Sequence, residues 1–339
     1  MKAILLVRHG KAQDAFAIRE LPLPVPGPAQ VLIRTEASGL NFADVMSRLG
    51  LYRDAPPLPF VPGYEAVGRV EACGSEVRHV KKGDRVLAFT RFGAYAEYVC
   101  TDARAAVSIP EDMPAGAAAA LGTQYCTAWY AAEEALRLHE GEHVLVNAAA
   151  GGVGIALVQL AKRRKCIVYG ACGSDEKIAF LKELGVDHPL NYDKEDLYDT
   201  IRKIRGKRGL DVVFDSVGGS NFKKGYRLLG PGGRMVSYGA AERVNSKKLF
   251  ATLRLAWNFG FFSPIPLLMR SQALIGVNLL RIADHKPELI RRCLDQVVEL
   301  TLSGELKPHV GGVFPYRQVA EAHTFFESRK SMGKLIITW

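Results

Sequence analysis

The 339-residue sequence has few cysteines, and they form no recognisable pattern. The six lie far apart, and no two are spaced as a CxxC pair. This excludes a small disulfide-stabilised scaffold and indicates a reducing compartment. The N-terminus also lacks an export signal, because the apolar run before Arg8 is shorter than the roughly 7–15 residues that a secretory signal needs. We therefore expect a cytoplasmic protein.

The sequence also lacks the composition of disordered and fibrous proteins. Hydrophobic residues make up 48% and charged residues 24%, and the 33 glycines follow no Gly-X-Y period. That amount of apolar material is enough for a packed core. At about 150 residues per domain, the length predicts two domains.

Positive charge prevails, with 45 Lys and Arg against 35 Asp and Glu and a net charge of +10. The basic residues gather at 162–165, 202–208 and 223–224. No nucleic-acid-binding motif accompanies them, so we expect no nucleic-acid partner. We interpret them as solvated helix faces and helix C-termini, with an anionic cofactor or an acidic membrane surface as the alternatives.

One apolar segment, residues 249–269, is about as long as a membrane span. Arg254, Asn258, Pro264 and Pro266 interrupt it, so we expect no transmembrane helix. Packing over a substrate cleft, a subunit contact and peripheral attachment to lipid remain as alternatives.

The pattern of the chain changes near residue 125. Before it, turns and short alternating runs predict an antiparallel β region, with strands at 31–36, 66–72 and 85–89. After it, apolar strands alternate with amphipathic helices, which predicts βαβ units and a parallel sheet. The strands are expected at 143–148, 166–171, 211–214 and 234–238, and the helices at 152–164 and 176–184.

The C-terminal part predicts a strand at 273–279, helices at 287–303 and 316–328, and a last strand at 334–338. The parallel block is thus flanked by two segments that we expect to belong together. The fold class is α/β, with a Rossmann-type doubly wound parallel sheet at 125–272 and a mainly β catalytic domain formed by 1–124 and 273–339.

The strongest chemical signal is NAAAGGVG at residues 147–154, which follows a predicted strand and opens a predicted helix. Its first glycine permits a tight turn, the next two residues present backbone N–H groups, and the last glycine lets the helix pack close to the strand. Such a loop holds the pyrophosphate of a dinucleotide at the helix N-terminus. The residues assigned to it are Ala150, Gly151, Gly152, Val153 and Gly154.

The end of the second predicted strand decides between NAD and NADP. An NAD site has Asp or Glu there, which binds the ribose 2′-hydroxyl. Here the turn at 172–174 is small and neutral, although the next two residues, Asp175 and Glu176, argue for NAD. A nearby lysine and tyrosine can bind a 2′-phosphate, so we predict NADP(H) as the cofactor. The residues assigned to this phosphate are Gly173, Ser174, Lys177 and Tyr192.

Two segments near the N-terminus carry a family resemblance. They are GLNFAD at 39–44, and PGYE at 62–65 with Gly68 and Val70. Together with the glycine loop and Gly333-Lys334, they resemble the medium-chain dehydrogenase/reductase superfamily over nearly the whole chain, which implies that the β domain is GroES-like. Within that superfamily, the chain resembles the zinc-free quinone oxidoreductase branch. LNFADVMSRLGLY at 40–52 and GVNLL at 276–280 resemble its vesicle amine transport protein-like subgroup.

Zinc-dependent members of that family have Cys where this chain has Asn41 and His where it has Tyr64, and neither replacement is a usual zinc ligand. Those members also carry clustered cysteines for a structural zinc, whereas residues 85–115 contain only Cys100. The resemblance therefore implies no metal. Without a metal to stabilise an alkoxide, we expect hydride transfer to a quinone or an α,β-unsaturated carbonyl, whose conjugation spreads the arriving charge.

The resemblance also implies the site residues. Asn41 and Asp44 are expected near the nicotinamide ribose and the substrate. Tyr52 is expected to donate a proton or bind the substrate oxygen, with a merely cleft-capping role as the alternative. Contacts to the cofactor are implied for Thr127, Tyr238, Gly239, Val277, Asn278, Leu279 and Lys334.

These observations predict an NADPH-dependent quinone or enone oxidoreductase. The alternative is an NADPH-binding protein with little turnover that acts at membranes or with protein partners, which the apolar segment and the net charge motivate. A homodimer is expected, because the strand at 273–279 resembles a sheet edge that can pair with its copy.

Overall fold

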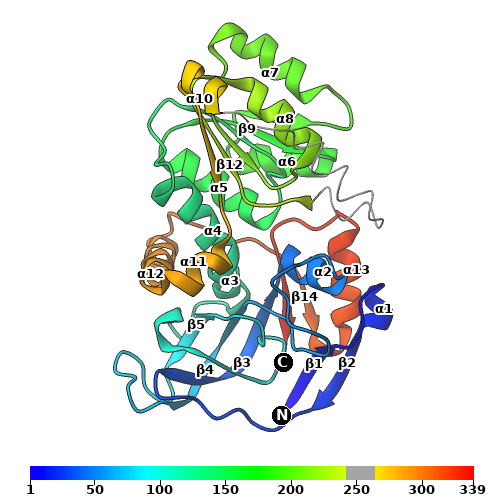
Figure 1. Ribbon diagram of the computed structural model, residues 1–339, viewed down its shortest axis with the longest axis vertical. Helices are drawn as coiled ribbons and strands as arrows, with labels where there is room; N and C mark the ends of the chain where they lie inside the picture. The colour runs from blue at the N-terminus through cyan, green and yellow to red at the C-terminus, as the bar shows by residue number, and fades with distance from the viewer. Residues whose placement is uncertain (242–263) are drawn as a thin grey trace. The chain divides into compact units, whose positions relative to one another are not determined.

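The computed structural model describes residues 1–241 and 264–339. The chain forms two compact units, each with its own large sheet (Figure 1). Unit 1 comprises Met1–Cys126 and Leu279–Trp339, and unit 2 comprises Thr127–Asn278. Both ends of the chain therefore belong to one unit. Of the apolar segment 249–269, residues 249–263 lie outside the described residues.

Unit 1 is built on a seven-stranded sheet in the order β14-β15-β3-β4-β5-β7, with β6 paired to β3. Neighbouring strands are antiparallel, except that β14 and β15 are parallel. The strands are β3 (Gln30–Leu40), β4 (Glu65–Cys73), β5 (Arg85–Phe89), β6 (Tyr98–Asp102), β7 (Ala106–Ser108), β14 (Val310–Pro315) and β15 (Lys334–Thr338), and β1 (Lys2–Leu6) and β2 (Phe16–Glu20) form a separate pair. The C-terminal strand β15 thus lies beside β3.

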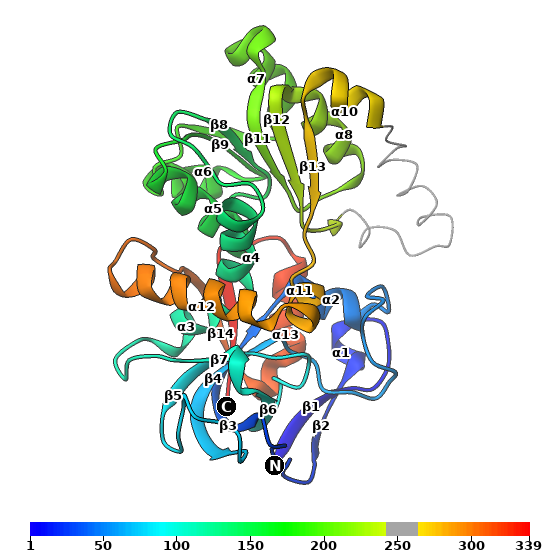
Figure 2. The ribbon, with the colours of Figure 1, turned by 60° about the vertical axis from the view of Figure 1, so that its left-hand side comes forward.

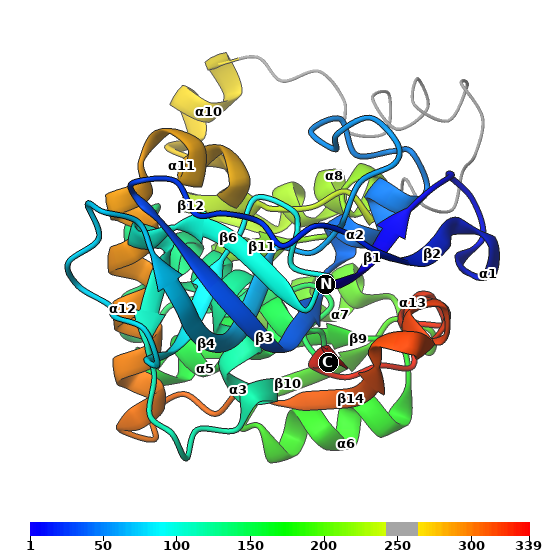
Figure 3. The same ribbon diagram turned by 90° about the horizontal axis from the view of Figure 1, so that it is seen from below.

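Helices of unit 1 pack against this sheet or against each other. They are α1 (Ala12–Ala15), α2 (Phe42–Arg48), α3 (Ala115–Ala120), α11 (Leu279–His285), α12 (Pro287–Leu302) and α13 (Val319–Glu327). α12 packs beside β7, and α13 packs beside β14 and β15. α12 and α13 lie on opposite sides of the unit (Figure 3). The buried face of α12 carries Ile290, Leu294 and Val297, at the i, i+4, i+7 spacing of an amphipathic helix.

Unit 2 is built on a parallel sheet in the order β10-β9-β8-β11-β12-β13. Its strands are β8 (His143–Val146), β9 (Ile167–Cys172), β10 (His188–Asn191), β11 (Leu210–Asp215), β12 (Leu229–Ser237) and β13 (Ala273–Gly276). In chain order this is 3-2-1-4-5-6, the doubly wound arrangement of dinucleotide-binding folds. The order reverses between β8 and β11, where such folds bind their ligand.

Helices connect these parallel strands. The connecting helices are α5 (Gly152–Arg163), α6 (Asp175–Glu183), α7 (Leu197–Arg205), α8 (Gly219–Leu228) and α10 (Pro264–Arg270), whereas α4 (Cys126–Trp129) precedes β8. The basic runs at 162–165 and 202–208 end α5 and α7, where cations complement the helix dipole, as predicted. None of the described helices is long and apolar enough to cross a bilayer.

The strand predicted at 273–279 is shorter than expected and belongs to unit 2. β13 ends at Gly276, and α11 begins at Leu279, in the other unit. Its only neighbour in the described sheet is β12, so β13 forms one edge (Figure 2). The unit boundary therefore lies at 278 rather than at 272, because pairing with β12 holds this segment in the parallel sheet.

Candidate functional site

The glycine loop connects β8 to α5 in unit 2. Gly151 precedes the first turn of α5, and the N–H groups of that turn have no acceptor within the helix. A Cβ atom at Gly154 would lie 2.3 Å from the carbonyl oxygen of Ala148, so only glycine permits this approach. Three backbone N–H groups, at residues 152–154, are thus available to an anion at the positive end of the helix dipole.

Two polar residues hold this loop against the neighbouring strand. The backbone N–H of Asn147 donates to Phe214 at 3.0 Å, and its side-chain amide donates to the Asp215 carboxylate at 3.1 Å. Asp215 is fully buried at the end of β11, and it also accepts from the N–H of Gly218. Neither Asn147 nor Asp215 was among the predicted site residues. Asn147 directly follows β8 and Asp215 is the last residue of β11, and these two strands flank the switch point.

The four residues assigned to the 2′-phosphate come together at the end of β9. Ser174 caps α6, and its hydroxyl accepts from the backbone N–H of Lys177 at 3.3 Å. Gly173 lies against Tyr192, since a Cβ atom there would be 2.6 Å from the tyrosine hydroxyl. These contacts bring the Ser174 hydroxyl, the backbone of Lys177 and the Tyr192 phenol to one neutral turn.

Asp175, the residue that argued for NAD, is engaged elsewhere. Its carboxylate accepts from Lys194 Nζ at 2.5 Å and from Asn191 Nδ2 at 3.0 Å. The hydrogen bond from Lys194 lowers the pKa of this exposed carboxyl. Asp175 is therefore held toward β10 and the residues that follow it.

Most of the remaining predicted cofactor residues lie beyond the ends of strands in unit 2. The N–H of Tyr238 donates to Asp215, and the N–H of Val277 donates to Ser237, so the ends of β11, β12 and β13 form one edge. Gly239 approaches the carbonyl of Ser216 too closely for a side chain. Thr127 is buried on α4, Asn278 ends unit 2 and Leu279 opens α11 in unit 1. Their contacts to a cofactor stay predictions.

In unit 1, a buried polar cluster surrounds Asn41. The amide nitrogen of Asn41 donates to both carboxylate oxygens of Glu65, at 2.8 and 3.0 Å, and its oxygen accepts from Lys334 Nζ at 2.7 Å. Lys334 also forms an ion pair with Glu65, and both side chains have no exposed surface. The hydroxyl of Thr123 donates to the same carboxylate.

The cluster differs from the expectation for Lys334. The resemblance implied a contact with the cofactor, and that contact stays a prediction, whereas the partners observed for its ammonium are protein groups. Glu65 and Thr123 were not among the site residues predicted from the sequence. The signal for Glu65 was present in the PGYE segment at 62–65, but its cationic partner lies 269 residues away along the chain.

This donor set does not fit a zinc ion. Asn41 and Tyr64 are not usual zinc ligands, and the Lys334 ammonium already supplies a positive charge to the cluster. Within residues 1–241 and 264–339, no group of three or more His, Cys, Asp or Glu side chains is placed to hold a metal.

Asp44 lies beside the cluster as part of the cap of α2. Its carboxylate accepts from the backbone N–H of Asn41 at 2.9 Å and of Gly63 at 3.0 Å. Burial raises the pKa of Asp44 from 3.8 to about 7, against the lowering effect of these hydrogen bonds. Asp44 is thus a folding element whose charge state changes near neutral pH.

Asp44→Asn is expected to flatten the dependence of stability on pH. Between about pH 4 and pH 7 the native state holds a proton that the unfolded chain has released, so this group's contribution is present at low pH and lost as the pH rises. At 1.36 kcal/mol for each pKa unit, the loss between pH 5 and pH 8 is about 2–3 kcal/mol. Urea unfolding across this range measures it, with the exposed Asp14→Asn as control. Parallel curves for wild type and Asp44→Asn would contradict the assignment.

Tyr52 follows α2 and is half-buried against Tyr64. Their ring centroids are 6.2 Å apart in an edge-to-face arrangement. Burial raises the pKa of Tyr52, and the negative charge of Asp54 adds to this effect. The phenol therefore keeps its proton well into the alkaline range, as a proton donor must.

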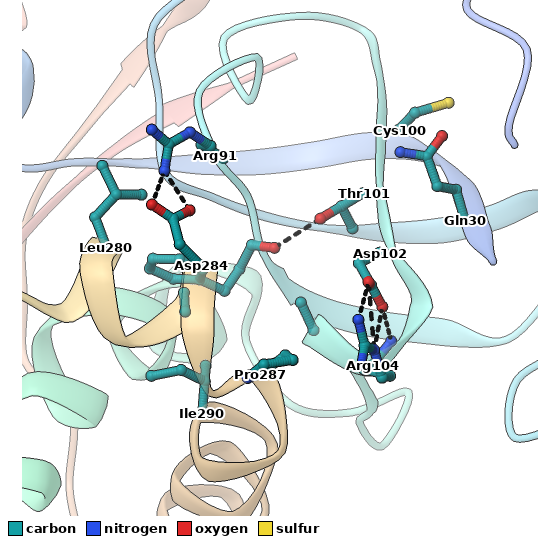
Figure 4. A pocket seen from close by; sticks show the side chains of 13 residues that line it. Gln30, Arg91, Cys100, Thr101, Asp102, Arg104, Leu280, Asp284, Pro287 and Ile290 are labelled. Carbon is teal, nitrogen blue, oxygen red and sulfur yellow. Dashed lines mark hydrogen bonds and ion pairs between the residues drawn. The ribbon is translucent and has the colours of Figure 1, made fainter. Parts of the chain in front are cut away.

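Two ion pairs join α11 to the loops near Tyr52. Arg281 pairs with Asp54, and Asp284 pairs with Arg91, as Figure 4 shows for the second pair. Arg91 and Asp284 also line a polar hollow of about 360 Å³ in unit 1. Because its charged lining residues are paired with each other or with Glu288, we assign this hollow no ligand.

Two protein-family models match this chain. One is described as the alcohol dehydrogenase GroES-like domain and matches residues 27–111, and the other is described as zinc-binding dehydrogenase and matches residues 152–294. The zinc in the second description does not fit the donor set around Asn41.

Known proteins resemble the chain over nearly its whole length. It is 40% identical to the Homo sapiens synaptic vesicle membrane protein VAT-1 homolog, across 99% of this chain and 86% of that protein. It is 33% identical to the Mus musculus quinone oxidoreductase-like protein 2, across 96% and 89%. The solved structure of Escherichia coli quinone oxidoreductase complexed with NADPH covers 100% of both chains at 27% identity, with a TM-score of 0.87. The chain therefore belongs to the medium-chain dehydrogenase/reductase superfamily, in its quinone oxidoreductase branch.

Proposed function

We propose that the protein is an NADPH-dependent, zinc-independent oxidoreductase that transfers hydride to a quinone or an α,β-unsaturated carbonyl. The observation that carries this proposal is the glycine loop followed by a neutral turn, from which Asp175 is held away by Lys194 and Asn191. An NAD site needs a carboxylate at this turn, whereas Lys177 suits a 2′-phosphate. The NADPH complex of the Escherichia coli relative supports the choice of cofactor.

The residues present can hold each part of the cofactor. The N–H groups at 152–154 bind the pyrophosphate, and Ser174, Lys177 and Tyr192 bind the 2′-phosphate. The residues that follow β12 and β13, at 238–239 and 277–278, would line the nicotinamide half. When bound, NADPH supplies the hydride, which carries both electrons of the reduction.

The protein itself supplies a proton and orients the substrate. Tyr52 donates its phenolic proton to the substrate as hydride arrives, and solvent restores that proton afterwards. One hydride and one proton then convert an enone to a saturated ketone or a quinone to a hydroquinone. Because conjugation spreads the incoming charge, positioning can replace the Lewis acid that a simple ketone or alcohol requires.

The test is NADPH consumption with a panel of benzoquinones, naphthoquinones and enones, with an unconjugated ketone as the control. We expect turnover of the conjugated acceptors only, unchanged by a metal chelator. Saturable NADPH binding without consumption would favour the alternative below. Absence of NADPH binding would overturn the proposal.

The second candidate function is that of an NADPH-binding protein with little turnover that acts at a membrane surface. Helix α10 favours it, because Ile265, Leu268 and Met269 are 69–78% exposed beside Arg270. Exposed apolar side chains next to a cation suit the interface of an anionic bilayer. Co-sedimentation with phosphatidylserine vesicles tests this, and replacement of the three apolar residues by Ser is expected to abolish it. Equal binding by this variant would exclude α10 as the contact.

The homodimer is proposed to form through β13, the free edge of the parallel sheet in the described residues. Gly276→Lys is expected to give a monomer, because a charged side chain at an edge opposes strand pairing. The variant is expected to fold, since a Cβ atom at Gly276 would meet nothing within 4 Å. Light scattering after size-exclusion chromatography measures the mass, with Gly276→Ala as the control. A dimeric Gly276→Lys would place the interface elsewhere.

The cytoplasmic location stays a prediction, and its support is chemical. All six cysteines are free thiols, and Cys126, Cys166, Cys172 and Cys293 are buried. Free thiols in this number suit a reducing compartment.

A further inference from the structure

The ion pair between Glu65 and Lys334 is buried in the middle of the unit 1 sheet. Glu65 opens β4 and Lys334 opens β15, the two strands on either side of β3. Neither side chain has exposed surface. A buried pair of this kind is weak evidence for stability, because removing two charges from water opposes their attraction. The role of this ion pair therefore depends on the groups that it contacts, above all Asn41.

The backbone around the pair leaves room for it. A Cβ atom at Gly39 would lie 2.0 Å from a Glu65 carboxylate oxygen and 2.2 Å from Lys334 Cε. A Cβ atom at Gly122 would lie 2.8 Å from Glu65 Cβ. Glycine at both positions is thus required by the close approach of these side chains.

The charges of the pair dictate which way the Asn41 amide faces. An ammonium can only donate hydrogen bonds and a carboxylate can only accept them. The amide oxygen of Asn41 must therefore face Lys334, and its NH₂ group must face Glu65, as observed. A flipped amide would set NH₂ against the ammonium and oxygen against the carboxylate, with the loss of the three hydrogen bonds that the Asn41 amide makes to Glu65 and Lys334.

The same bonds decide what Asn41 can offer to a ligand. Its NH₂ group donates to the two oxygens of Glu65, and one lone pair of its oxygen accepts from Lys334. The Asn41 side chain also faces the backbone N–H of Asp44 in the capping box that opens α2. Because its NH₂ group is used by Glu65, Asn41 in this arrangement does not donate to a substrate carbonyl.

We propose that Glu65 and Lys334 are positioning residues, which lock the Asn41 amide and, through its capping box with Asp44, hold the start of α2 in the form that binds the reactants. This inference rests on the proposed function, since it gives Asn41 its role in binding the reactants. It adds that a metal-free member of the family uses a buried ion pair to orient this side chain.

The test exchanges the acid and the amide between positions 41 and 65. Asn41→Asp alone sets two carboxylates against each other, and Glu65→Gln alone leaves Lys334 without its anion. The double variant Asn41→Asp/Glu65→Gln keeps the net charge, gives Lys334 a carboxylate partner and lets the new glutamine amide donate to the new aspartate. An acceptor oxygen is still present at position 41 for the capping box of α2.

The measurements are the NADPH dissociation constant, kcat/KM for NADPH and the urea midpoint of each protein. We expect each single variant to lose about tenfold or more in kcat/KM, and the double variant to recover to within about threefold of wild type, a non-additivity expected only of coupled residues. If Glu65 and Lys334 served stability alone, the double variant would recover the urea midpoint without recovering NADPH affinity. A double variant that folds or binds no better than Asn41→Asp would overturn the inference, whereas a wild type that neither binds nor consumes NADPH would overturn the proposed function itself.

Discussion

Lys177→Glu is expected to weaken NADPH binding about 10- to 100-fold, which corresponds to the roughly 1.5–3 kcal/mol of a hydrogen bond to a charged group. The affinity for NADH is expected to change less than about threefold, because NADH has no 2′-phosphate to meet the new carboxylate. The dissociation constants of both cofactors, measured by calorimetry at one salt concentration, give this ratio.

The structure supports Lys177 as the residue to change. It lies in the first turn of α6, and its backbone N–H is fixed by the cap residue Ser174. The positive end of the helix dipole adds to the attraction of Lys177 for an anion. Gly173 and Tyr192 pack against each other beside it, so the turn has a defined shape.

Lys182→Glu is the matched control for this prediction. Lys182 lies in the last turn of the same helix and is exposed, so its reversal changes the net charge equally at a distance from the turn. We expect it to change both cofactor affinities by less than about twofold, since exposed charges more than about 10 Å apart are screened at ordinary salt. Equal losses of NADPH and NADH in Lys177→Glu would mean that the 2′-phosphate assignment is mistaken.

The cofactor unit could be predicted from the sequence because its signals are local. A strand, a glycine turn and a helix follow one another at 143–164, and the structure has β8 and α5 within two residues of the predicted bounds. β10 was missed because it has only four residues and contains Pro189. Periodicity gives no signal over so short a segment.

The surroundings of Asn41 could not be predicted, because they depend on strand pairing. Lys334 can contact Asn41 because β15 pairs with β3, in a register that sets Leu335 opposite Leu40. No spacing along the chain encodes a pairing between its two ends. The orientation of Asp175 has the same cause, because its partner Asn191 lies on the neighbouring strand β10. Sequence reasoning thus identified the residue types, and tertiary pairing decided their partners.

Tyr52→Phe is expected to lower kcat about 100-fold, at the lower end of the range for loss of a general acid, with little change in the KM for NADPH. Burial and the charge of Asp54 raise the pKa of this phenol, so in wild type it stays protonated between pH 6 and 9. We therefore expect no fall in kcat that is due to Tyr52 in this range. Steady-state rates with one quinone across these pH values measure both effects.

Tyr64→Phe separates proton donation from packing. Tyr64 is 3% exposed, and its hydroxyl lies near the side chains of Tyr52 and Ser47. Its ring contacts Tyr52 and Phe92, and phenylalanine preserves both contacts. If Tyr52 acts through its proton, Tyr64→Phe retains kcat within about threefold while Tyr52→Phe does not. If Tyr52 only caps the cleft, phenylalanine serves as well as tyrosine, and a Tyr52→Phe enzyme with the wild-type rate would remove it from the mechanism.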